Sequence, residues 1–348
     1  MPFPDDTELY CAGNAMADVF ADADEAFCRR FGVTLPVQHV PAETMAAILA
    51  AVSAAASATL PASAVYASGG GAANTAKIAA RLGLKAAFFG CIGAEKTGGR
   101  ADRFGGFFEK ELAKAGVSAA LRLGKQPTGV FLCLTVNGEK RIAASPSAAR
   151  ELRAEDLPDP VLIRTQLNPL KKPRFQKPGA FLFEGFLLEN NDVKKRCLDI
   201  AGSSGLVPAF DPCTVSIAET YAEEILSWLE QYRLVLFVNE REAEALARRA
   251  YGGAAYGGAA RGWEALFKDL TAKGGSAAVK LAEKGAAIFS DGGFYRAETR
   301  PVKTAETTGA GDAVAAGFLA ALLRGKTPDQ CGREGNRAAR RFLERKIR

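Results

Sequence analysis

The sequence has few of the residues on which metal and nucleophile sites usually depend. His39 is the only histidine among 348 residues, which excludes a multi-histidine metal site and allows a Ser-His-Asp triad only if His39 supplies the base. The seven cysteines are odd in number, scattered and never spaced as C-x-x-C, so we expect neither a disulfide framework nor a zinc cluster. We interpret His39 as a solvated or lightly packed side chain and the free thiols as typical of a reducing cytoplasm.

Long apolar runs are also missing. The longest weakly polar run, residues 45–60, is mostly alanine and serine and is too short and too weakly apolar to span a bilayer. The first ten residues have neither the basic nor the apolar region of a secretory signal. The sequence therefore predicts a cytoplasmic protein with no membrane partner.

Positive charge is concentrated in two places. Residues 164–177 and 333–348 together carry a net charge of +10, whereas the whole chain carries +6, so the remainder is about −4. Neither segment interleaves its basic residues with aromatic residues suited to stacking on bases, and each is interpreted as a solvated face. We expect no nucleic-acid partner.

Short apolar runs alternate with helical patterns along the chain. The runs are continuous rather than alternating, as is typical of strands buried on both faces of a parallel sheet. They cover residues 85–89, 180–183, 206–210, 234–238 and 277–281. Together with the helical patterns between them, they predict an α/β fold with a doubly wound, mostly parallel sheet.

Polar and glycine residues follow several of these runs. They are Gly90 to Gly93, Glu184 with Gly185, Asp211 with Pro212, Asn239 with Glu242, and Glu283 to Gly285. In open α/β sheets, ligands bind beyond the carboxyl ends of the strands. The pattern therefore favours a functional site at that edge over ordinary strand ends.

Residues 129–145 differ from the parallel pattern. Asn137 and Gly138 provide a turn between two β-rich arms, which predicts an antiparallel hairpin. We expect a small β lid over the strand ends, formed from about residues 14–42 and 118–145. Residues 158–179 and 250–260 are interpreted as surface insertions.

Two nearly all-apolar helices begin at glycine clusters, "SGGGAANTAKIAARLG" (68–83) and "ETTGAGDAVAAGFLAALLRG" (306–325). Unpaired amides at a helix start attract anions, and Gly309 and Gly311 leave room for one. Considered alone, this stretch favours the ordinary interpretation of Asp312 as an N-cap. The sequence contains no P-loop, because the glycine required before Lys96 is absent.

The combination of motifs resembles a known family. "SGGGAANTA" followed by "ETTGAGDAVAAGF" resembles the two signatures of the ribokinase-like, or PfkB, carbohydrate kinases, and "VNERE" (238–242) resembles their N-x-x-E motif. The resemblance extends from about residue 9 to the C-terminus. It implies one kinase domain, residues 1–348, with a ribokinase-like fold.

The resemblance also implies a role for several residues. Asp312 would take the proton from the acceptor hydroxyl, and the amides of Gly309, Ala310 and Gly311 would stabilise the transferred phosphoryl group. Asn239 and Glu242 would act on Mg²⁺ and its water shell. The residues implied in binding ATP are Lys280, Glu283, Gly285, Thr308 and Asn336.

The acceptor implied by the resemblance is a nucleoside or a sugar. "GNAMADVF" (13–20) is similar to the start of adenosine-kinase-like members, in which Asn14 and Asp18 would contact ribose hydroxyls. Gly70, Gly71 and Asn74 would complete this pocket. The alternatives are a free-sugar kinase of the ribose or fructose type and a kinase-fold binding protein without activity.

Two further expectations concern potassium and the oligomeric state. Glu306 stands where relatives often have an aspartate linked to a monovalent-cation site, which argues against potassium activation. We expect a monomer or a homodimer.

Overall fold

A computed structural model of the chain describes residues 6–56, 65–95, 98–166, 179–252, 262–304 and 307–346. Glu306 and most of the two proposed insertions lie outside the described residues. Among the helices that the structure describes, none is both long enough and apolar enough to cross a membrane.

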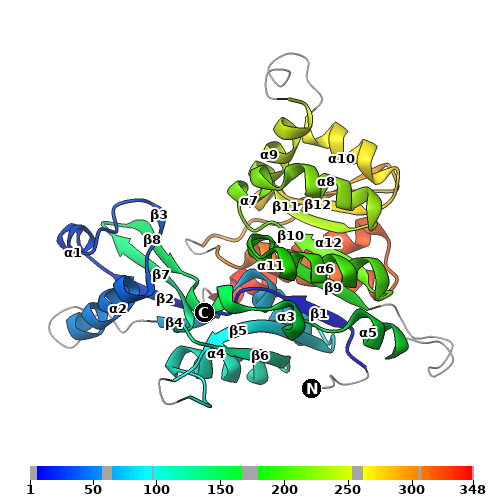
Figure 1. Cartoon of the computed structure of the whole chain (residues 1–348). Helices are drawn as coiled ribbons and strands as arrows, with labels where there is room; N and C mark the ends of the chain where they lie inside the picture. Colours follow the sequence, from blue (N-terminus) through cyan, green and yellow to red (C-terminus); the bar gives the residue numbers. More distant parts are fainter. Residues whose placement is uncertain are drawn as a thin grey trace.

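The body of the protein is built on a nine-stranded sheet within the described residues (Figure 1). In spatial order its strands are β14 (Gly293–Ala297), β13 (Ala286–Ser290), β12 (Ser276–Lys280), β11 (Val235–Asn239), β10 (Val207–Asp211), β9 (Ala180–Glu184), β1 (Leu9–Ala12), β5 (Ala86–Gly93) and β6 (Ser118–Gly124). The strands from β12 to β6 run parallel to one another, whereas β13 pairs antiparallel with both of its neighbours, β12 and β14. The expected α/β fold with a mostly parallel sheet is confirmed.

Helices cover both faces of this sheet because its central strands are apolar on both sides. On one face pack α3 (Gly71–Arg81), α4 (Arg103–Lys114), α11 (Ala310–Leu322) and α12 (Pro328–Lys346). On the other face pack α5 (Pro160–Gln166), α6 (Asn191–Ser203), α7 (Val215–Thr220), α8 (Ala222–Gln231), α9 (Glu240–Ala250) and α10 (Trp263–Thr271).

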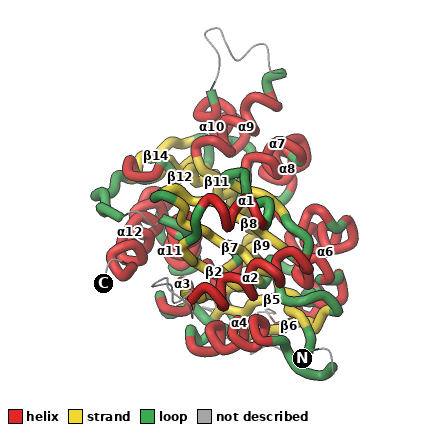
Figure 2. Tube along the Cα trace, turned by 90° about the vertical axis from the view of Figure 1, so that its left-hand side faces the viewer, coloured by secondary structure: helices red, strands yellow, loops and turns green. Residues whose placement is uncertain are grey.

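A second, smaller sheet forms the lid. Its order is β3 (Val37–His39), β8 (Glu139–Ser145), β7 (Gly129–Val136), β2 (Met16–Asp22) and β4 (Val65–Gly69). The helices α1 (Glu25–Arg30) and α2 (Ala42–Ala56) lie between β2 and β4 in the sequence. The lid stands apart from the main sheet in Figure 1 and lies in front of it in Figure 2.

The two faces of the lid sheet have different surroundings, because side chains alternate along each strand. Val19, Leu132 and Ala143 contribute to a buried core that also includes residues of α1 and α2. Their neighbours Asp18, Phe131 and Ala144 are paired across β2, β7 and β8 and face the body of the protein. The lid therefore presents the Asp18 carboxylate within a largely apolar surface.

The structure corrects the expected boundary of the lid. Residues 118–124 form β6 at the edge of the main sheet, and the second lid segment begins at Gly129. Residues 65–69, which lie outside the two expected lid segments, form the lid strand β4. The expected turn at Asn137 and Gly138 does connect the hairpin β7–β8, with both residues at positive φ.

Candidate active site

A cavity of about 1220 Å³ lies between the lid and the carboxyl ends of the main strands. It collects residues that are far apart in the sequence. The predicted site residues along its wall are Asn14, Asp18, Gly70, Gly71, Asn74, Asn239, Glu242, Lys280, Thr308, Gly309 and Asp312. His39 is exposed on β3 and also borders this cavity.

Asp312 lies in the first turn of α11, which follows a sharp change in backbone direction. Gly309 has φ +86°, a conformation that disfavours other residues, and an added Cβ would lie 2.9 Å from the Phe342 ring. The Asp312 Oδ2 atom accepts a hydrogen bond from Asn74 Nδ2 at 2.9 Å. Its Oδ1 atom lies beside Gly71, where the lack of a side chain keeps the carboxylate open to the cavity.

Burial sets the proton affinity of this carboxylate. Loss of solvent raises the Asp312 pKa to about 6, although the Asn74 hydrogen bond and the charges of Lys280 and Lys77 lower it. Asp211 adds to the rise through its negative charge. The group is therefore mostly ionised at neutral pH and can still exchange a proton, which suits a general base.

The amides at the start of α11 differ in their surroundings. The Ala310 amide donates to the Thr307 carbonyl at 3.0 Å, so this turn already uses one of the three amides expected in the anion hole. Gly311 lies against the end of the Lys280 side chain, because an added Cβ would be 3.4 Å from its Nζ atom. A fixed cation thus stands beside the helix start, where an anion is favoured.

Lys280 is held at the end of β12 by a buried ion pair. Its Nζ atom donates to Asp211 Oδ2 at 2.7 Å, and both side chains are mostly buried. Although burial works against the charged form, Asp211 and Glu242 raise the Lys280 pKa above its ordinary value. Lys280 therefore remains a cation.

Asn239 and Glu242 close the beginning of α9. The Asn239 side chain accepts from the Glu242 amide, and the Glu242 carboxylate accepts from the Asn239 amide, each at 2.9 Å. This reciprocal pair is a capping box. Burial and the nearby Asp211 charge raise the Glu242 pKa, so a bound cation would relieve an unfavourable carboxylate.

Glu184 follows an apolar run in the sequence, but no sequence motif gives it a role. It lines the cavity and is 1% exposed, with Oε1 accepting from the Asn14 amide at 2.7 Å and Oε2 from the Ala72 amide at 3.0 Å. These two amides lie where the chain passes between body and lid. Burial raises the Glu184 pKa to about 7.

Asp18 occupies the lid side of the cavity and is 9% exposed. Its carboxylate lies against the backbone of Gly69, where an added Cβ would be 1.9 Å from Oδ1. Gly70 follows with φ +93°, and an added Cβ would be 2.1 Å from the Asn14 carbonyl oxygen. These glycines let β4 approach the loop before β2 closely.

Three predicted nucleotide residues lie outside the cavity wall. Glu283 is exposed in the short 3₁₀ helix η5 (Ala282–Lys284). Gly285 has φ +90° and packs on the Ala297 carbonyl, which accepts from the Asn336 side chain at 2.7 Å. The geometry of Gly285 and Asn336 thus fastens α12 to the end of β14.

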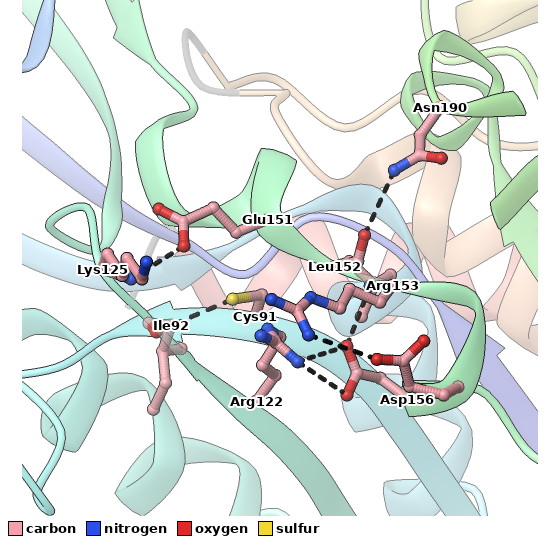
Figure 3. Close-up of polar contacts among 10 residues, drawn as sticks. Cys91, Ile92, Arg122, Lys125, Glu151, Leu152, Arg153, Asp156 and Asn190 are labelled. Carbon is pink, nitrogen blue, oxygen red and sulfur yellow. Dashed lines mark hydrogen bonds and ion pairs between the residues drawn. The ribbon is translucent and has the colours of Figure 1, made fainter. Parts of the chain in front are cut away.

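A cluster of polar contacts holds the segment that forms one side of the cavity, residues 147–156 (Figure 3). The 3₁₀ helix η1 (Ser147–Glu151) carries the cavity-wall residues Ala149 and Arg150, and the wall residue Leu152 lies between η1 and the 3₁₀ helix η2 (Ala154–Asp156). The Glu151 carboxylate accepts from the amide of Lys125, and Asp156 accepts from Arg122 (Figure 3). Glu151 also accepts from the amide of Gln126. These contacts hold η1 and η2 against the end of β6.

Known proteins are similar to this chain over most of its length. The sequence profile of the pfkB family carbohydrate kinases matches residues 42–346. The chain is 26% identical over 274 residues to a sugar kinase of Archaeoglobus fulgidus, covering 76% of this chain and 94% of that protein. It is also 26% identical over 288 residues to a ribokinase of Haemophilus influenzae, covering 78% and 79% of the two chains.

A solved structure shares the whole architecture. The adenosine kinase from Sinorhizobium meliloti superposes with a TM-score of 0.74 at 25% identity, over 97% of this chain and 94% of that one. The match includes both the nine-stranded body and the lid region within its coverage. It supports the ribokinase-like fold expected from the sequence.

Proposed function

Because this chain belongs to the pfkB family of carbohydrate kinases, we propose that it transfers the γ-phosphoryl group of ATP to the hydroxymethyl group of a nucleoside similar to adenosine. Membership of the family makes it a phosphotransferase with an alcohol acceptor, a sugar or nucleoside kinase. The acceptor, the roles of individual residues and the use of Mg²⁺ are parts of the proposal.

The observation that carries the proposal is the position of Asp312. Its carboxylate borders the same cavity as Asp18 on the lid side and Glu242 on the body side. An acceptor held at Asp18 and a phosphate held near Glu242 would therefore meet at the start of α11. This convergence is what transfer between two bound substrates requires.

Asp312 acts in this mechanism as the general base. Asn74 holds Oδ2, which leaves Oδ1 to accept the proton of the attacking hydroxyl. The positive end of α11 and the Lys280 ammonium stabilise the charge on the transferred phosphoryl group, because both are fixed before the reaction begins. Asp211 keeps Lys280 in place.

The residues present fit a magnesium ion bound together with ATP. In the described part of the chain, no three His, Cys, Asp or Glu side chains lie close enough together to hold a metal ion alone. Mg²⁺ commonly binds through one or two carboxylates, water and substrate phosphates, and Glu242 with Asp211 would supply such a set. When bound, the ion would neutralise phosphate charge.

The lid favours a nucleoside over a free sugar. Asp18 can accept hydrogen bonds from a vicinal diol, and the cavity wall around it includes Met16, Phe131, Leu152 and Phe186. These apolar side chains would cover a base attached to the sugar. The similarity to an adenosine kinase supports this acceptor, whereas the similarity to a ribokinase supports a free sugar.

The replacement Asp18→Ala tests the acceptor. We expect the KM for a ribonucleoside to rise at least tenfold, since a charge-assisted contact to the diol is lost, while the KM for ATP changes less than about twofold. Asp22→Ala, at the exposed end of the same strand, is the matched control and should leave both constants unchanged. Ribonucleosides, deoxyribonucleosides, ribose and fructose are compared with both variants and the wild type.

The results separate the two acceptors. Preference for ribonucleosides, lost in Asp18→Ala, would support the nucleoside proposal. Equal use of ribo- and deoxyribonucleosides by the wild type would refute the role of Asp18 in diol recognition. Turnover with ribose or fructose alone would make the protein a free-sugar kinase.

The cellular setting is a further part of the proposal. The cysteines Cys11, Cys28, Cys91, Cys133, Cys197, Cys213 and Cys331 are all free thiols. Free thiols throughout a cysteine-containing chain are typical of a reducing compartment. We therefore propose that the enzyme acts in the cytoplasm, as a monomer or homodimer.

A further inference from the structure

Lys77 is a buried cation for which the mechanism above has no use. It lies in α3, three residues after Asn74, and Ala73, Ala76 and Ala79 of the same helix are also buried. The residue is only 9% exposed and is not part of the cavity wall. An ammonium group in such surroundings is unfavourable unless it has specific partners.

The partners of Lys77 lie on the lid. Its Nζ atom donates to the Ser68 carbonyl at 2.5 Å and to the Ser68 hydroxyl at 2.7 Å. Ser68 is near the end of β4, directly before Gly69, and the Asp18 carboxylate lies against Gly69. The same strand end therefore separates the Lys77 ammonium from the carboxylate that faces the cavity.

Several charged groups act on the Lys77 ammonium. Burial and Arg81 on its own helix lower the Lys77 pKa to about 8. Asp18 of β2, Asp312 of α11 and Glu111 of α4 favour the charged form, and Asp18 has the largest effect of these three. The cation and the carboxylate of Asp18 thus stabilise each other across β4.

We propose that Lys77 is a positioning residue for the phosphate acceptor: anchored by Ser68, its ammonium group holds the Asp18 carboxylate and the end of β4 in the arrangement that binds the acceptor. This role rests on the proposed function of Asp18. Lys77 does not touch the acceptor, so its removal acts through Asp18.

The replacement Lys77→Met tests this role, because methionine fills most of the space without the charge. We expect the KM for the acceptor to rise about tenfold, as for loss of one charged partner in a coupled pair, with the KM for ATP within about twofold. The surface replacement Lys273→Met, at a side chain that is 64% exposed, is the control. In the Asp18→Ala variant, the second replacement Lys77→Met should raise the acceptor KM little further, because the carboxylate through which Lys77 acts is absent.

The pH dependence provides a readout that a merely structural role would not change. In the wild type the KM for the acceptor should rise as the pH increases through about 8, because Lys77 loses its proton there. In Lys77→Met the KM should be raised already at pH 7, and this rise between pH 7 and 9 should be absent. An unchanged KM at pH 7, or a rise between pH 7 and 9 as large as in the wild type, would overturn the proposal.

Three further outcomes keep the test decisive. If Lys77→Met fails to fold, Ser68→Ala removes one of the two acceptors of the ammonium and should raise the acceptor KM about threefold; no change there would overturn the proposal. If Asp18→Ala leaves the acceptor KM unchanged, the proposed function of Asp18 fails. If Asp18→Ala raises it but Lys77→Met does not, only the role of Lys77 fails.

Discussion

The replacement Asp312→Asn should make the enzyme slower and more stable at the same time. Asparagine preserves the shape and can still accept the Asn74 hydrogen bond, but it cannot take the proton of the attacking hydroxyl. We expect turnover to fall on the order of a hundredfold or more, with the KM for ATP little changed.

The gain in stability follows from the raised pKa of Asp312. Burial moves the pKa from 3.8 to about 6, a shift that corresponds to about 3 kcal/mol. Because Asp312 borders the cavity and is only partly buried, water there screens its charge, and we expect about 1–2 kcal/mol. Asparagine, which carries no charge, avoids this unfavourable burial.

The raised pKa of Asp312 also determines how this difference in stability changes with pH. Between pH 4 and 6 the folded wild type binds a proton that the unfolded chain has already released, so its free energy of unfolding falls as the pH rises. The advantage of Asp312→Asn should therefore be near zero at pH 4, grow to pH 6 and stay constant above pH 7. Urea unfolding at pH 4, 5, 6, 7 and 8 measures this difference in the free energy of unfolding. The kcat is measured on native protein from the same preparations.

Two results would refute this reasoning. Near-normal turnover would remove Asp312 from the role of general base. A variant no more stable than the wild type at pH 8 would show that the Asp312 charge is not unfavourable in the folded protein. Asp329→Asn, at a partly exposed carboxylate paired with the exposed Arg333, is the matched control and should show neither effect.

Three further predictions address other parts of the structure. Gly70→Ala should lower the free energy of unfolding by about 3 kcal/mol, because of its positive φ and the Asn14 carbonyl oxygen 2.1 Å from the new Cβ; urea unfolding measures this, and wild-type stability would contradict it. Glu242→Gln should raise the Mg²⁺ concentration for half-maximal activity at least tenfold, and an unchanged Mg²⁺ titration would exclude Glu242 from the metal site. Replacing residues 166–177 by a short Gly-Ser link should keep turnover within about twofold, since loop closure depends weakly on length; lost activity would mean that the segment completes the site.

Features with local causes could be predicted from the sequence. The apolar runs predict the central strands, and the glycines before Ala72 and Asp312 indicate where buried helices begin. The carboxyl ends of parallel strands meet at one edge, so Asn239 and Lys280 could be expected to lie near each other.

Features that depend on distant pairing could not be predicted. Glu184 bonds to amides 170 and 112 residues away, and no pattern near Glu184 specifies those partners. The strand β6 has a mixed burial pattern at a sheet edge, so its sequence does not distinguish the main sheet from the lid. Lysine side chains are usually exposed. Only the structure shows that Lys77 is buried against Ser68.

The central position of β1 has a consequence for synthesis on the ribosome. This strand pairs through Leu9 with Ala86 of β5 on one side and with Ala180 of β9 on the other. After β5 has been made, the second edge of β1 must wait for β9, which at ordinary translation rates is about 5–20 s. During that time the nascent chain carries an open, apolar strand edge, the kind of surface on which chains join by mistake.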